Sequence, residues 1–379
     1  MPPLTPVRYR FLTQAADIRA CITSWTALRA IALDLEADSL YSYPEKVCLV
    51  QVSTADENVI LDPLRGAEGM RTLSPLLADR GILKVLHGGD YDVRLLKRGF
   101  GFELHNLADT MIGAQLLGRQ RVGLADLLKE EMGAQIDKRY QHANWSRRPL
   151  PEEMLLYAAL DTAYLLPLWQ RLSEQLSHLG RLNWAREEFE LLEQATPAAE
   201  RPPSCFDVKG AYHLPARQRA TLQALVELRE ETARAWGRPP FKVLGNQVLL
   251  NWAQNPPLDH RELLQSRGAS KGILHRLAPQ ILTALRAAQS VPVSDCPQRH
   301  LPSRPPLSQE EHRRLRRLKQ VRQAAAERLD LSAGLLVNTR TLETLARAAP
   351  DEAAAMLQSL LKRWQITLLG PALLQALQA

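Results

Sequence analysis

Cysteine is scarce in this chain, and long hydrophobic runs are absent. The four cysteines among 379 residues lie far apart, which excludes a zinc knuckle or a disulfide framework and fits a reducing cytoplasm. No apolar run reaches the roughly eighteen residues that a membrane span requires, and the stretch Met1–Gln14 lacks the apolar core of a secretory signal. We therefore expect a cytoplasmic protein without a membrane segment.

The length and the charge indicate several domains with different tasks. A chain of 379 residues is expected to form two or three domains. Residues 1–200 carry 22 Lys and Arg against 27 Asp and Glu, a net charge of −5, whereas residues 201–379 carry 26 against 14, a net charge of +12. An acidic part followed by a basic part favours chemistry in the first and binding of a polyanion in the second, over the simpler alternative of an unevenly charged surface.

Two acids stand at the end of the first predicted long strand. Ala30–Glu36 has the pattern of a buried strand, and Asp34 and Glu36 project from the same face of it. Two carboxylates on one face repel each other unless a cation lies between them, although a strand end in solvent would also explain them. The runs 46–53 and 58–62 alternate like two further strands, so we expect an antiparallel meander.

A second acidic motif follows the next predicted strand. After a helix at about 67–78 and a strand at 83–86 come the residues HGGDYD, whose glycines mark a turn into a helix. Asp90 is placed to cap that helix, and Asp92 lies in its first turn, where the helix dipole favours an acid. His87 is a candidate ligand, but a lone histidine beside a glycine turn is more often a packing or hydrogen-bonding residue.

The third motif, YAALDTAYL, lies in a helical pattern that runs from about Glu152 to Leu179, with Pro151 at its start. Tyr157 and Asp161 are four residues apart, so they share one face of this helix and can act on the same object. By itself this pair is weak evidence, because the same spacing occurs on many solvated helices.

The residues between these motifs leave two alternatives open. Helical periodicity covers 105–117 and 124–132, and Asp109 is either a fifth acid of the site or, as we favour, a residue that satisfies a helix start. The basic and aromatic loop Lys138–Pro149 could guide a phosphate backbone or stack a base. Equally, its Trp145 could plug the underside of the last helix.

The second half of the chain has the features of a duplication. Pro- and Ala-rich linkers after Gln194 and at 291–306 divide it into two helical segments. Aligned with an offset of 93 residues, their apolar positions coincide and Arg229 falls opposite Arg322. Two unrelated bundles would share the apolar periodicity, but the matched arginines and prolines favour a repeat.

Together, the three motifs resemble a known family. DLE at Asp34–Glu36, HGGDYD ending at Asp92, and YAALD ending at Asp161 resemble the DEDDy 3′–5′ exonuclease superfamily, and the stretch around the third motif resembles the ribonuclease D family. The two C-terminal segments resemble the helicase-and-RNase-D C-terminal (HRDC) domain. In the second motif, alignment from His87 favours Asp92 over Asp90 as the acid of the family.

The resemblance implies a fold and a domain organisation. We expect an α/β, ribonuclease H-like exonuclease domain with a mixed sheet at residues 1–195. Two small all-α HRDC-like helical bundles should follow, at 210–290 and 307–379.

The resemblance also implies a mechanism. Four carboxylates without His or Cys suit two divalent metal ions, Mg²⁺ or Mn²⁺, about 3.5–4 Å apart. By resemblance, Asp34 bridges both ions, Glu36 and Asp161 complete one site, and Asp92 serves the other, while Tyr157 orients the attacking water. All five residues precede residue 162, so the chemistry is expected to need nothing after the first linker.

The expected function is a metal-dependent 3′–5′ exoribonuclease. It would release nucleoside 5′-monophosphates from tRNA precursors or other structured RNA with 3′ extensions, acting as a monomer, with the basic bundles holding RNA. One alternative is a DNA 3′–5′ exonuclease of the RecQ-helicase-associated type. Another is a catalytically idle nucleic-acid-binding scaffold, which we rank last because no acid of the motifs is missing.

Overall fold

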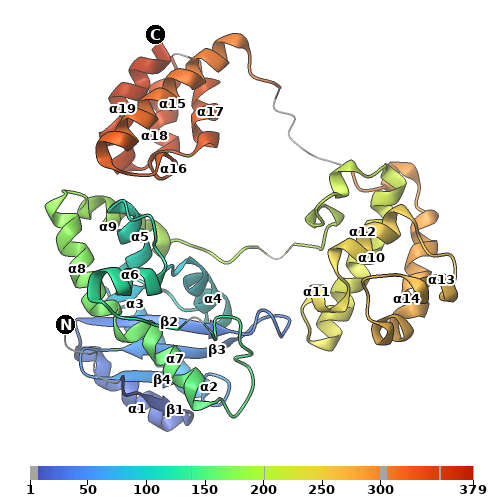
Figure 1. Cartoon of the computed structure of the whole chain (residues 1–379), viewed down its shortest axis with the longest axis horizontal. Coiled ribbons are helices and arrows are strands. Elements are labelled where there is room, and N and C mark those ends of the chain that lie inside the picture. The colour runs from blue at the N-terminus through green and yellow to red at the C-terminus, as the bar shows by residue number, and fades with distance from the viewer. Residues whose placement is uncertain (1–6, 138, 200, 299–304, 350, 379) are drawn as a thin grey trace. The chain divides into compact units, whose positions relative to one another are not determined.

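A mixed β-sheet of six strands carries the first motif, within the part of the chain that the structure describes. The computed structural model describes residues 7–137, 139–199, 201–298, 305–349 and 351–378 (Figure 1). The strands are β1 (Arg10–Leu12), β2 (Ala30–Ala37), β3 (Val47–Ser53), β4 (Asn58–Leu61), β5 (Leu83–Leu86) and β6 (Leu107–Asp109). Some of the predicted segments lie partly outside the described residues, namely residues 1–6 of the N-terminal stretch, Lys138 of the loop, residues 200 and 299–304 of the two linkers, and residues 350 and 379 of the last predicted domain.

The sheet has the order β1-β4-β3-β2-β5-β6. β3 and β4 are antiparallel, which confirms that hairpin of the predicted meander, whereas β1 runs parallel to β4, and β5 runs parallel to both β2 and β6. Both strands at the edges, β1 and β6, are three residues long and were not predicted, because so short a run has no readable periodicity.

Helices that pack on the sheet place the other two motifs. They are α1 (Ala15–Ser24), α2 (Ala67–Met70), α3 (Leu73–Ala78), α4 (Asp90–Phe100), α5 (Thr110–Leu116), α6 (Leu124–Met132), α7 (Glu152–Ala163), α8 (Leu165–His178) and α9 (Leu182–Glu193). α7 lies across β3 and β4 (Figure 1). α8 packs against β5.

Two of the predicted helices were wrong in part. The pattern at 105–117 begins with β6, and only its second half is the helix α5. The long pattern at 152–179 is two helices that meet at Tyr164, whose φ of −109° and ψ of 0° leave the helical region. Pro167 explains the break, because a proline lacks the N–H that would bond one turn back and fits only the first turn of a new helix.

The second half of the chain forms two helical bundles with matching elements. The first holds α10 (Ala216–Trp236), α11 (Pro240–Val243), α12 (Asn246–Gln254), α13 (His260–Gln265) and α14 (Lys271–Gln289). The second holds α15 (Gln309–Leu329), α16 (Ala333–Leu336), α17 (Thr339–Ala346), α18 (Ala353–Leu360) and α19 (Arg363–Gln378). With the predicted offset of 93 residues, the bounds of α10 coincide with those of α15, and the bounds of α11 coincide with those of α16.

The matched arginines have the same structural role in the two bundles. Arg229 Nη1 donates to the carbonyl oxygen of Leu244 at 3.2 Å, and Arg322 Nη1 donates to that of Val337 at 2.9 Å. Leu244 and Val337 are themselves 93 residues apart. Each arginine therefore ties the long first helix of its bundle to the turn after the next short helix, which explains why both copies carry it.

The bundles belong to different compact units of the molecule. One unit comprises residues 1–36, 47–197 and 304–379, and the other comprises 37–46 and 198–303. The second bundle therefore shares a unit with the sheet, and its buried leucines join those of α8 and α9 in one hydrophobic core. The limits of the three predicted domains stay a prediction. The second bundle, however, packs into the same unit as the sheet and is not a separate unit.

Candidate active site

A pocket of about 460 Å³ is lined by four of the five residues of the predicted site. Asp34 and Glu36 from β2 line it, and so do Tyr157 and Asp161 from α7. Asp92 is not among the residues that line the pocket and lies in the first turn of α4, where it is only 7% exposed. It is nevertheless near the other acids, because its charge raises the pKa of Glu36 and the charge of Asp34 raises the pKa of Asp92. Three segments that are distant in sequence thus contribute acids to one place.

The ionisation of these acids shows that they are crowded. Burial raises the pKa of Asp34 to about 7. Burial also raises the pKa of Glu36 well above its ordinary value, with further contributions from the charges of Asp34, Asp161 and Asp92. The pKa values of Asp92 and Asp161 are likewise raised, first by burial and then by the charge of Asp34. The site therefore favours either protonation or the binding of cations.

The donor set fits hard divalent cations. The converging groups are carboxylates, and ions such as Mg²⁺ and Mn²⁺ prefer oxygen ligands. As they stand, no three His, Cys, Asp or Glu side chains of the described residues are arranged to share one ion. Binding of an ion would therefore require the side chains to turn toward it.

The remaining polar residues of the second motif have other partners. Asp90 is the first residue of α4 and pairs with Arg94 at 2.9 Å on the surface, so Gly89, and not Asp90 as predicted, is the N-cap. Asp109 caps α5 by accepting from the backbone N–H groups of Met111 and Ile112, and it also accepts from Gly88 and Gly89, which confirms its structural role.

His87 borders the pocket with a defined hydrogen bond. Its Nδ1 lies 2.9 Å from Oγ1 of Thr110, and that hydroxyl donates to the carbonyl oxygen of Leu86 at 3.1 Å. Because the hydroxyl proton is used there, Nδ1 of His87 donates and Nε2 carries the free lone pair. Burial lowers the pKa of His87, so the ring is neutral.

The aromatic ring of Tyr157 is held between two side chains from the loop 139–149. Trp145 lies at 6.0 Å between ring centroids, and Tyr140 lies edge-on at 5.9 Å. Trp145 is 1% exposed, which decides between the two roles predicted for it, since a buried ring packs under α7 and cannot stack a base. Tyr140 donates its hydroxyl to Glu153 at 2.7 Å.

Burial raises the pKa of the Tyr157 hydroxyl, and the charges of Asp161, Glu36 and Asp34 raise it further. At neutral pH the phenol is therefore protonated and can donate a hydrogen bond.

Some pocket residues were not predicted. Tyr91, Asp137 and Gln141 line the pocket beside the acids. Tyr91 stands between the two aspartates of the second motif, so its place on the first turn of α4 could have indicated it. Asp137 and Gln141 come from a loop without periodicity, and no pattern in the sequence marks them.

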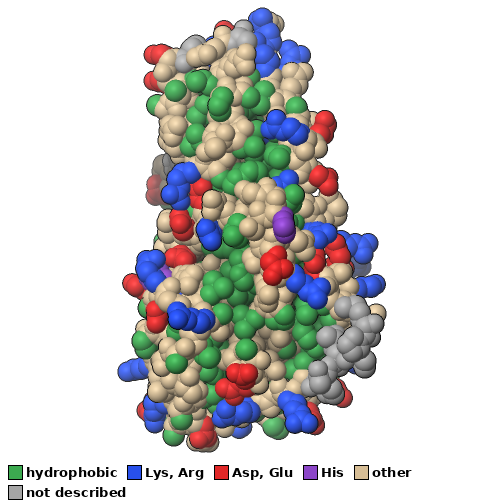
Figure 2. Space-filling model, turned by 90° about the vertical axis from the view of Figure 1, so that its left-hand side faces the viewer, with side chains coloured by type: hydrophobic (Ala, Val, Ile, Leu, Met, Phe, Trp, Pro, Cys, Tyr) green, Lys and Arg blue, Asp and Glu red, His purple; other side chains and the backbone are tan. Residues whose placement is uncertain are grey.

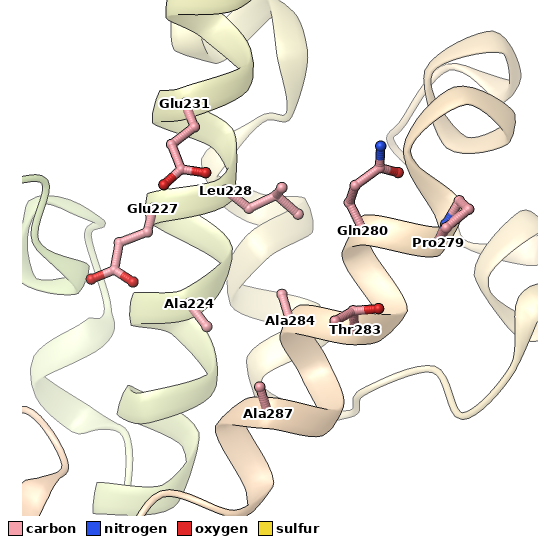
Figure 3. A pocket seen from close by; sticks show the side chains of 9 residues that line it. All are labelled: Ala224, Glu227, Leu228, Glu231, Pro279, Gln280, Thr283, Ala284 and Ala287. Carbon is pink, nitrogen blue, oxygen red and sulfur yellow. The ribbon is translucent and has the colours of Figure 1, made fainter.

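A second hollow, of about 570 Å³, lies on the first bundle between α10 and α14 (Figure 3). Its acids are Glu227 and Glu231, one turn apart on α10, and α14 contributes Gln280, Thr283 and Ala284 among others. Its two acids come from one helix only, and the other described residues of its lining are uncharged, with Gln280 and Thr283 as the polar members. The chemistry therefore belongs to the pocket in the sheet unit.

No helix among the described residues is long and apolar enough to span a membrane.

Comparisons with known proteins agree with this geometry. Residues 9–177 match the family model described as 3′–5′ exonuclease, and residues 218–285 and 311–377 match that of the HRDC domain. Ribonuclease D of Granulibacter bethesdensis is 27% identical over 352 residues, which cover 91% of this chain and 88% of that protein. Human exosome complex component 10 is 31% identical over 271 residues, which cover 69% of this chain and 31% of that protein. The crystal structure of Escherichia coli RNase D, described as an exoribonuclease involved in structured RNA processing, superposes with a TM-score of 0.74 at 27% identity, covering 98% of this chain and 99% of that one.

Proposed function

Since the chain is a 3′–5′ exoribonuclease of the ribonuclease D type, we propose that its four converging carboxylates hold two divalent metal ions and that Tyr157 orients the attacking water. The observation that carries the proposal is the crowding of Asp34, Glu36, Asp92 and Asp161, whose charges are mutually unfavourable without cations. Asp34 would bridge the two ions, Glu36 and Asp161 would complete one site, and Asp92 would serve the other.

The reaction divides between the ions and the protein groups. Two bound ions would supply positive charge to the attacking and leaving oxygens and make water a better nucleophile. The neutral hydroxyl of Tyr157 hydrogen-bonds the water and aligns it with the phosphorus. The water oxygen bonds to phosphorus and gives up a proton to solvent, the bond to the 3′ oxygen of the shortened RNA breaks and that oxygen takes up a proton from solvent, and a nucleoside 5′-monophosphate leaves.

The proposed substrates are tRNA precursors or other structured RNA with 3′ extensions, cut by a monomeric enzyme in the cytoplasm. All four cysteines are buried and unbridged, which suits a reducing compartment. The basic bundles would hold the RNA through its phosphates. Helix α15 carries a basic run at residues 313–319. In this run, Arg314 and Arg317 donate to the carbonyl oxygens of Ala348 and Ala376, so that part of the charge serves the fold.

The basic side chains do not form one separate band on the face that Figure 2 shows. On the face in Figure 2, Lys and Arg side chains lie among Asp and Glu side chains, with hydrophobic patches between them. Net charge alone therefore does not mark an RNA path on that face.

A time course on a 3′-extended tRNA tests the proposal. The wild-type chain should release 5′-mononucleotides with Mg²⁺ or Mn²⁺ and none with a chelator, and the Asp34→Asn and Asp161→Asn variants should be inactive although folded. These variants keep the side-chain volume and remove one charge from the metal ligands. Turnover near that of the wild type in either variant would contradict the assignment of the acids. A similar digest of single-stranded DNA measures the preference for RNA.

A further inference from the structure

Arg148 joins the loop 139–149 to two strands of the sheet. Its Nε and Nη2 form two parallel bonds to the carboxylate of Asp62, at 2.7 and 2.8 Å, just beyond the end of β4. Nη2 also donates to the carbonyl oxygen of Cys48 on β3, at 2.9 Å. The Asp62 side chain is fully buried and that of Arg148 is 12% exposed, so solvent screens this pair little.

The same guanidinium also holds the loop itself. Nη1 donates to the carbonyl oxygens of Trp145 and Arg147, both at 2.7 Å. A guanidinium has five N–H groups, and all five are now used. Lysine, with one nitrogen and three donors, could not reproduce this arrangement.

Trp145 has no hydrogen bond of its own to fix its ring. Its buried indole N–H lacks a partner among the described residues. The place of the ring therefore depends on packing and on the backbone that Arg148 holds. That ring packs beneath α7 in one cluster with Leu49 and Ile60 of the sheet, and it supports the ring of Tyr157 at 6.0 Å between centroids.

We propose that Asp62 and Arg148 are positioning residues of the reaction, which set the place of the Tyr157 hydroxyl through Trp145. They touch neither the pocket nor the acids. They fix the backbone at Trp145 relative to the sheet that carries Asp34, and Trp145 in turn limits where the Tyr157 ring can lie. A shift of about 1 Å in a group that aligns a nucleophile is enough for a large loss of rate. The inference rests on the proposed role of Tyr157.

A double-mutant cycle with Arg148→Lys and Tyr157→Phe tests the proposal. The full chain is assayed on a short single-stranded RNA at saturating Mg²⁺, with kcat and KM determined separately. In the wild-type background, Arg148→Lys should lower kcat roughly 10- to 100-fold with little change in KM. In the Tyr157→Phe background it should lower kcat less than about threefold, because the hydroxyl it positions is already gone.

Matched variants keep the test decisive. Arg147→Lys changes the exposed neighbouring side chain and should leave kcat unchanged. If Arg148→Lys does not fold, as judged by circular dichroism and Tm, Asp62→Asn replaces it, since it keeps the shape and removes the charge of the other partner.

Equal losses in both backgrounds, or no loss, would overturn the proposal. Full activity of Tyr157→Phe would overturn it too, together with the proposed role of Tyr157, while the proposed role of the four carboxylates would stand as long as Asp34→Asn is inactive. Activity of Asp34→Asn would instead contradict the proposed function.

Discussion

Trp184 on α9 and Trp364 on α19 stack with their ring centroids 4.9 Å apart and their planes 17° apart. Near this pair, glutamates of α9 form hydrogen bonds and ion pairs with the residues at the start of α19. Glu188 pairs with Lys362 at 2.6 Å and accepts the indole N–H of Trp364 at 2.8 Å. Part of the charge difference between the two halves of the chain therefore serves to hold the second bundle on the sheet unit.

Glu187 caps α19 from another helix, and its loss should destabilise the sheet unit. Its carboxylate accepts from the backbone N–H groups of Arg363 and Trp364, at 2.6 and 3.0 Å. Glu187→Gln should lower the free energy of unfolding by about 1 kcal/mol, as measured by denaturant titration, because the amide keeps one acceptor oxygen and turns a donor NH2 toward the other backbone N–H.

Glu190→Gln is the control for that variant. It removes an exposed partner of Arg363 and should change stability much less, because exposed ion pairs contribute little. Equal effects of the two variants would show that charge at this surface matters and capping does not. A chain that ends before residue 305 should lose more stability than either, since it exposes the packed faces of α8 and α9.

Asp92 and Asp90 should respond very differently to the same substitution. Asp92→Asn should abolish hydrolysis, because this buried carboxylate is one of the proposed metal ligands. Asp90→Asn should leave kcat close to that of the wild type and change Tm little, since Asp90 is exposed and pairs only with Arg94 among the partners found. The assay is single-turnover hydrolysis of a short RNA; the opposite ranking would show that the motif was misaligned.

The hydroxyl of Tyr157 should matter more than its ring. Tyr157→Phe keeps the ring beside Trp145 and should lower kcat by roughly 10²–10⁴-fold, as for loss of a positioned proton-transfer group, with the Mg²⁺ dependence unchanged. Tyr140→Phe is the control, because it removes only a bond to Glu153 outside the pocket lining. A similar rate for both variants would leave Tyr157 with a packing role.

The site was largely predictable from the sequence because its residues lie on periodic elements. Asp34 and Glu36 share a strand face, and Tyr157 and Asp161 share a helix face, so the spacing alone gives their direction. The tertiary partners of Arg148 were not predictable in this way. Its bonds to Asp62 and the backbone join segments whose approach depends on the whole sheet.

The second bundle was also predictable from the sequence only in part. Its repeat with the first bundle was readable, since both α10 and α15 carry the same apolar period. Its attachment to α9 was not, because Glu187 and Glu188 look like ordinary solvated acids of a helix until their partners are known. The break at Tyr164 was predictable only in part. Pro167 indicates that a helix starts nearby, but the apolar pattern continues across it and hides the break.

The pH dependence of stability should reveal the crowded acids and their need for cations. Without divalent ions, the folded chain binds more protons than the unfolded chain between about pH 4, the ordinary carboxyl pKa, and about pH 7, to which burial raises the pKa of Asp34. The contribution of Asp34 to the free energy of unfolding therefore falls as the pH rises through this window, and stays low above it. Bound Mg²⁺ should remove this penalty. The rise in Tm on adding Mg²⁺ should thus be larger at pH 8 than at pH 5.5.

Asp34→Asn is the comparison that isolates this effect, because other groups also titrate over the same range. Without Mg²⁺, the variant should be more stable than the wild type at pH 8, and the difference should shrink toward pH 4, since asparagine carries no charge to bury. The variant should also gain much less Tm from Mg²⁺ at pH 8. The same Mg²⁺ response in both proteins would place the ion elsewhere. A wild-type response that does not change with pH would mean that protons and cations do not compete for these carboxylates.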